Sequence, residues 1–87
     1  MSVEDIPSGH RHLTSIMEAM TEGHEITIGY RKYTSSLDEI LNLKPYAVKE
    51  YAKRWYLIAY CNERQGIRVY GLDRITRLDT NGKQFKI

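Results

Sequence analysis

The spacing of apolar residues changes once along this chain, close to Gly23. Before that point, four apolar residues follow the spacing of one face of an amphipathic helix: Leu13, Ile16, Met17 and Met20. Gly23 follows at the place where glycine commonly ends a helix in a left-handed conformation. The pattern therefore predicts a helix over about residues 10–22 that packs over one end of a sheet.

After residue 25, apolar side chains recur at every second position, which is the period of a strand. Ile26, Ile28 and Tyr30, for example, alternate with polar or small residues. Short segments rich in Gly, Asn, Ser and Pro separate the apolar runs and predict turns. We expect strands over residues 25–31, 39–50, 54–61, 66–72 and 75–80.

Local motifs refine this prediction. Pro45 cannot donate a ladder hydrogen bond, so it marks an edge position or a bulge in the second strand. Residues 34–36 and 62–66 predict turns. Asn81-Gly82 is typical of a type I′ hairpin, so residues 83–87 are expected to pair back on the fifth strand.

One helix followed by five locally connected strands predicts a mainly β protein, a small antiparallel barrel with an N-terminal α-helix. The 87 residues allow a single domain with a modest core. We expect residues 1–9 to form an irregular linker and residues 10–87 to form the domain.

Composition narrows the classes of function. The net charge of +2 argues against a strongly basic nucleic-acid binder. Acidic residues dominate the first 25 positions and basic residues gather later, which predicts a local basic patch. The single cysteine, Cys61, allows no internal disulfide, so we expect a cytoplasmic protein. No apolar run is long enough for a membrane span, and no membrane partner is expected.

Two runs of residues carry a resemblance to a known family. Residues 54–60 contain Trp55-Tyr56-Leu57, and residues 68–75 read Arg-Val-Tyr-Gly-Leu-Asp-Arg-Ile. In this order and spacing, they resemble the WYL domain family over roughly residues 13–80. The resemblance implies an Sm-like (SH3-like) barrel with a tight, often 3₁₀, turn between its last two strands.

The same resemblance implies a ligand-sensing module of a bacterial transcriptional regulator, attached to a helix-turn-helix DNA-binding domain in the full-length protein. The family's first arginine aligns on Arg68, whereas Gly71 stands where many members have a second arginine.

Catalytic chemistry has no recognisable basis in this sequence. None of the common nucleophile, zinc-hydrolase or phosphate-loop motifs occurs, and no His, Cys or carboxylate group has a metal-ligand spacing. We expect no enzyme activity, no cofactor and no bound metal, with Cys61 serving as a small core residue.

Strand parity indicates which side chains face the core. In the third strand, a narrow interior favours the row of Leu57 and Ala59, which leaves Tyr56 outward or beneath the helix. In the fourth strand, we expect the aliphatic Ile67 and Val69 to face inward. Their neighbours Arg68 and Tyr70 would then line an outer groove.

Arg68 and Tyr70 are the principal candidates for ligand binding. A guanidinium beside an aromatic ring can hold a phosphate or carboxylate while a ligand ring stacks alongside. Alternatively, the arginine simply leans over its tyrosine neighbour. Further candidates are Arg74, Tyr56, Lys49, Arg54 and Tyr30. Asp73 has a structural alternative in its turn, and Arg74 could pair with it or cap strand-end carbonyls.

We therefore expect a sensory domain that binds an anionic small molecule or a short single-stranded nucleic acid. An Sm-like module that only mediates homodimerisation is the main alternative. A general single-stranded RNA binder is a third, which the net charge of +2 disfavours.

Overall fold

A single helix precedes the sheet in the described part of the chain. The computed structural model describes residues 11–32 and 37–85. Helix α1 (Leu13–Glu22) buries Ile16 and Ala19, and it ends at Gly23, whose φ of 69° is left-handed. The Gly23 N–H donates to carbonyls of the last helical turn, as such an end requires. The helix prediction is confirmed, although the helix begins at Leu13 rather than at residue 10.

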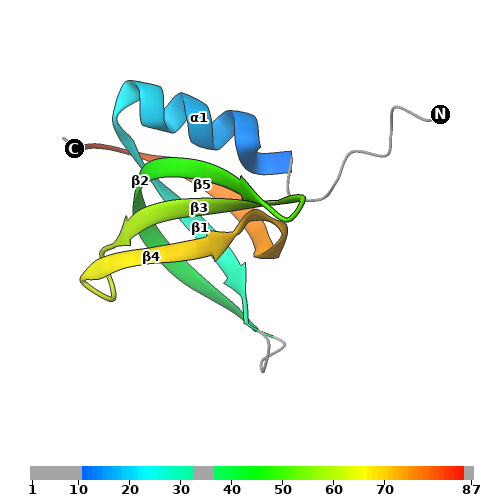
Figure 1. Cartoon of the computed structure of the whole chain (residues 1–87). Helices are drawn as coiled ribbons and strands as arrows, with labels where there is room; N and C mark the ends of the chain where they lie inside the picture. The colour runs from blue at the N-terminus through cyan, green and yellow to red at the C-terminus, as the bar shows by residue number, and fades with distance from the viewer. Residues whose placement is uncertain (1–10, 33–36, 86–87) are drawn as a thin grey trace.

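Five antiparallel strands form one strongly curved sheet beneath this helix (Figure 1). The sheet contains β1 (His24–Arg31), β2 (Asp38–Tyr51), β3 (Arg54–Cys61), β4 (Gly66–Gly71) and β5 (Ile75–Gln84). The strand order is β4-β3-β2-β1-β5, so β4 and β5 are the two edges. The mainly β fold with an N-terminal helix is confirmed, but β4 and β5 do not pair and the sheet stays open.

The 3₁₀ turn η2 (Leu72–Arg74) joins β4 to β5, as the family resemblance implied. It lies between two edge strands that are far apart in the strand order. One side chain bridges the open side of the sheet near this turn. The Gly71 N–H donates to the Tyr30 hydroxyl at 3.1 Å, which links the end of β4 to β1 without a backbone ladder.

A β-bulge at Pro45 lets the long strand β2 bend. Pro45 is paired with Ala59 and Ala47 with Ile58, so Tyr46 is the additional residue. Because β2 is an inner strand, the bulge rather than an edge position accommodates the missing N–H of proline.

The prediction of a hairpin at Asn81-Gly82 is wrong. Thr80 pairs with Ile26 and Gln84 with His24, so β5 continues along β1 through an irregularity. Gly82 has a φ of 82° there. Its left-handed conformation therefore serves a bulge within one strand, which the local sequence does not distinguish from a hairpin turn. The expected linker over residues 1–9, the turn at 34–36 and the last two residues lie outside the described residues.

Strand β3 carries the centre of the core. Leu57, Ala59 and Cys61 are fully buried, and Trp55 packs at the margin of the same cluster. They meet apolar side chains of the helix, of β1 and of β2: Ile16, Ala19, Ile26, Ile28, Leu41 and Leu43. The inward assignment of the Leu57–Ala59 row is confirmed, as is the core position of Cys61.

The inward assignment of strand β4 is wrong. Ile67 and Val69 are 58% and 62% exposed, whereas Tyr70 is only 5% exposed. The register places Tyr70 opposite the buried Leu57, so the parity of β3 dictates that of β4. Burying one large aromatic ring removes more apolar surface from water than burying a valine does, and it fills the open side of the sheet.

Replacing Leu57 with alanine tests the core assignment. We expect Leu57→Ala to lower the free energy of unfolding by about 2–5 kcal/mol, because the side chain is fully buried and leaves a cavity. Val69→Ala is the matched control, and since Val69 is exposed we expect a change within about 0.5 kcal/mol. Urea denaturation followed by circular dichroism measures both values. Equal losses in the two variants would contradict the assignment.

Candidate functional site

A depression of about 310 Å³ lies beside β4, where the sheet is open. We call it the β4 depression. It is lined by the ends of β1 and β2, by the β3–β4 turn and by β4 itself: Tyr30, Lys32, Glu39, Arg64, Arg68, Val69 and Tyr70. These residues include three cations, one carboxylate and two phenol rings, so the depression combines positive charge with aromatic surface.

The side chains on the inner face of β1 and β2 continue from the core into this depression. On β1, the buried Ile28 is followed two residues later by Tyr30 and then by Lys32. On β2, Glu39 is paired with Tyr30 and precedes the buried Leu41 by two residues. Because alternate residues share a face, the core rows become polar where the sheet ends.

Arg68 and Tyr70 lie on the same face of β4, opposite Ala59 and Leu57 of β3. Tyr70 is buried, whereas Arg68 is exposed at the margin of the depression. The Arg68 guanidinium donates to the carbonyl of Ile67 at 3.1 Å and forms no ion pair with any described residue. Most of its five donors therefore remain available to an anion.

The two tyrosines of the depression form an edge-to-face pair. The Tyr30 and Tyr70 ring centroids are 5.1 Å apart, and the rings are inclined by 83°. The Arg74 guanidinium lies 5.7 Å from the Tyr30 centroid and donates to the Arg31 carbonyl. Arg74 therefore caps the end of β1, one of its two expected structural roles, and holds Tyr30 in place.

The Tyr70 hydroxyl has no hydrogen-bond partner among the described residues, although it is buried. Burial, together with the neighbouring Cys61 thiol, raises the pKa of the Tyr70 phenol above its ordinary value. The hydroxyl therefore stays protonated at neutral pH, and its oxygen is buried near the Cys61 thiol rather than exposed to the depression.

The single carboxylate of the depression, Glu39, is paired with two of its cations. It accepts a hydrogen bond from Arg64, and its Oε1 lies 3.6 Å from the Lys32 ammonium. The hydrogen bond from Arg64 lowers the pKa of Glu39 and correspondingly raises the pKa of Arg64. Arg68 is the one lining cation that Glu39 does not engage through an ion pair.

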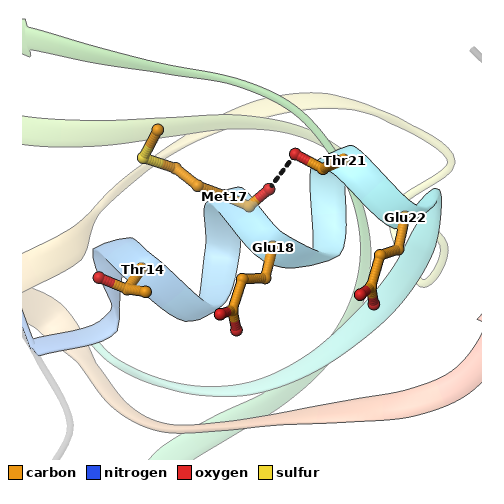
Figure 2. A pocket seen from close by; sticks show the side chains of 5 residues that line it. All are labelled: Thr14, Met17, Glu18, Thr21 and Glu22. Carbon is orange, nitrogen blue, oxygen red and sulfur yellow. Dashed lines mark hydrogen bonds between the residues drawn. The ribbon is translucent and has the colours of Figure 1, made fainter.

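A depression of about 410 Å³ lies on the outer side of α1 and has the opposite charge. Figure 2 shows its lining, in which the Thr21 hydroxyl donates to the Met17 carbonyl at 3.0 Å. Its ionisable groups are the carboxylates of Glu18 and Glu22, so it repels the anions that the β4 depression attracts.

Comparison with known proteins decides the family. A model of the WYL domain matches residues 11–80 of this chain. The chain belongs to the WYL domain family. Among solved structures, it is similar to proteasome accessory factor B/C (PafBC) of Arthrobacter aurescens, with a TM-score of 0.85 and 26% sequence identity. The match covers 97% of this chain but only 13% of that one. A comparison with curated proteins found no match.

The predicted binding residues of this WYL domain divide between two faces. Arg68, Tyr70 and Tyr30 meet in the β4 depression, although on the inner side of β4 rather than in an outer groove. Lys49 and Tyr56 lie on the outer face, in a mostly apolar depression of about 270 Å³. That second depression is completed by three further side chains: Tyr51, Ile58 and Val69.

Arg54 serves a structural contact, and Asp73 is its partner. The Arg54 Nε and Nη2 atoms lie 3.1 Å and 2.6 Å from Asp73 Oδ2, which ties the start of β3 to η2. The neighbouring Gly71 leaves little room for a larger residue, because a Cβ atom there would lie 3.1 Å from Asp73 Oδ1. Arg54 and Arg74 are thus engaged within the fold and do not replace the second family arginine in the β4 depression.

Sequence reasoning missed Lys32, Glu39 and Arg64. Continuing the period of two beyond Tyr30 would have reached Lys32, and extending it back from Leu41 would have reached Glu39. No such period reaches Arg64, which lies in the turn before β4.

Within residues 11–32 and 37–85, no group of three His, Cys, Asp or Glu side chains is placed to hold a metal ion. The helix in this part of the chain is too short and too polar to cross a membrane.

Tyr70→Phe tests the unpaired hydroxyl. The folded pKa is raised, so the protonated phenol contributes stability that is present below the ordinary tyrosine pKa of about 10 and is lost as pH rises above it. We expect the unfolding free energy of the wild type to fall more steeply above that pH than the free energy of Tyr70→Phe. At neutral pH the variant should be at least as stable, since it removes a buried polar group without a partner. Urea titrations at several pH values check both points, and parallel pH profiles would contradict the first.

Proposed function

We propose that this WYL domain is the ligand-sensing domain of a bacterial transcriptional regulator and that it binds a negatively charged ligand in the β4 depression. The ligand class is an anionic small molecule or a short single-stranded nucleic acid. One observation carries the proposal: Arg68, which makes no ion pair with a described residue, lines the β4 depression together with the half-buried ring of Tyr30.

The chemistry of the depression favours an anion that also carries a ring. A guanidinium binds phosphate or carboxylate oxygens through paired N–H donors, and the half-buried Tyr30 ring offers a surface for stacking, whereas Tyr70 is buried. The proposed role is non-catalytic. Binding would change the activity of an attached helix-turn-helix DNA-binding domain, which agrees with the small fraction of the PafBC chain that this domain matches.

Arg68→Ala tests the proposal. Titration of the wild type with a fluorescent, phosphorylated oligothymidylate should give binding that weakens with salt, because cations of the site release counterions. Arg68→Ala should weaken binding and reduce the magnitude of the slope of log K against log salt by about 0.7, the value for one lost contact to a single strand. The matched control is Arg77→Ala, since Arg77 is an exposed arginine outside the depression that pairs with Asp79. Equal binding by all three proteins would contradict the proposal.

Homodimerisation is the second candidate, and exposed apolar side chains on the outer face of the sheet support it there. Ile67 and Val69 are exposed on the edge strand β4, and Tyr51, Tyr56 and Ile58 border the apolar depression beside them. Exposed apolar side chains on an edge strand favour association with another chain.

Ile67→Lys separates this candidate from ligand sensing, since Ile67 does not line the β4 depression. If the outer face mediates dimerisation, analytical ultracentrifugation should show a dimer that Ile67→Lys converts to a monomer without loss of fold. A wild-type protein that stays monomeric at high concentration would exclude this function.

A further inference from the structure

The ion pairs of Glu39 suggest how the β4 depression selects its ligand. Glu39 is the sole carboxylate among the described residues that line it, and it contacts both Arg64 and Lys32. The single negative charge of Glu39 is therefore shared by two of the three lining cations, and it offsets one of their positive charges. An entering anion meets Arg68 directly, but it gains Arg64 and Lys32 only by displacing the Glu39 carboxylate.

We infer that Glu39 is an internal counter-anion that competes with the ligand, so that the site prefers a ligand carrying two negative charges over one carrying a single charge. This inference rests on the proposed function of the same depression. A dianion such as a terminal phosphate offers Arg68 one charge and retains a second with which to replace Glu39. A monoanion satisfies Arg68 alone and leaves the pairs of Glu39 intact.

The positions of the three side chains make this exchange feasible. Glu39 lies near the start of β2, where the inward row leaves the buried core, and its pairing with Tyr30 holds its backbone in place. The side chains of Arg64, Lys32 and Glu39 are 42%, 47% and 27% exposed. Ion pairs at this exposure are weak, because water screens them, so the second charge of a dianion is enough to replace them.

The Glu39 carboxylate can move without breaking the fold. Its backbone contributes to the β1–β2 ladder, whereas its side chain pairs with Arg64 and Lys32 at the margin of the depression. A rotation of the Glu39 side chain therefore changes the charge of the site and leaves the core rows undisturbed. Ligand binding would therefore change the position of the Glu39 side chain, which lies near the end of β1 and the start of β2.

Glu39→Gln tests the inference, because it removes the charge and keeps the size of the side chain. The probes are thymidine monophosphate, a dianion at a pH of about 8, since the second phosphate pKa is about 6, and its methyl ester, a monoanion. By isothermal titration calorimetry, the wild type should prefer the dianion. Glu39→Gln should bind the methyl ester about two- to fivefold more tightly, the range expected from releasing weak exposed ion pairs, and should gain less for the dianion.

Two further variants serve as controls, one for net charge and one for the cation that Glu39 pairs with. Asp79→Asn removes one negative charge outside the depression, where Asp79 pairs with Arg77, and should leave both affinities unchanged. In an Arg64→Ala background, the gain from Glu39→Gln should shrink, since one of the two cations that pair with Glu39 is no longer present. A gain of the same size in Asp79→Asn, or a gain that persists fully without Arg64, would overturn the inference.

The outcomes also separate this inference from the function on which it rests. If neither the wild type nor Glu39→Gln binds either probe or the oligothymidylate, the proposed function fails and the inference fails with it. If the wild type binds and Arg68→Ala does not, while Glu39→Gln matches the wild type for both probes, only the role of Glu39 is wrong. Binding that is gained only in Glu39→Gln supports the inference.

Discussion

The register between β3 and β4 is the constraint on which the rest of this structure depends. The row of Leu57, Ala59 and Cys61 is buried completely, so β3 has no freedom to present its other face. Since paired strands share their faces, Tyr70 must enter the core opposite Leu57, and Arg68 must follow it on the same side. One packing requirement thus places both an aromatic ring and a cation on the inner side of an edge strand.

The open side of the sheet turns this placement into a site. A fully closed sheet would satisfy the inner edge of β4 with backbone hydrogen bonds. Here Tyr30 bridges the gap with its hydroxyl, and its ring packs against Tyr70. The core rows of β1 and β2 continue past these rings as Lys32 and Glu39, so the hydrophobic interior passes into a charged depression within two residues. The same strands provide both the stability of the domain and its candidate binding groups.

Electrostatics distinguish this depression from the depression on α1 and from the one on the outer face of the sheet. The outer side of α1 carries carboxylates, and the outer face of β3 and β4 is mostly apolar with flanking lysine and arginine side chains. Other arginines, notably Arg54 and Arg74, hold elements of the fold together through Asp73 and the Arg31 carbonyl. The net charge of +2 therefore does not reveal that some cations stabilise the fold while others line the β4 depression.

The sequence by itself determined the helix, the five strands, the irregularity at Pro45 and the resemblance to the WYL family, because periodicity, turn residues and short motifs are local signals. It also identified Arg68 and Tyr70 as neighbours on one face. Only the tertiary structure decided that this face is the inner one, since the aliphatic residues of β4 compete with Tyr70 for burial and the register of β3 settles the competition. The bulge at Gly82 likewise depended on β5 continuing along β1. Lys32, Glu39 and Arg64 come from three separate segments, so only folding brings their charges together.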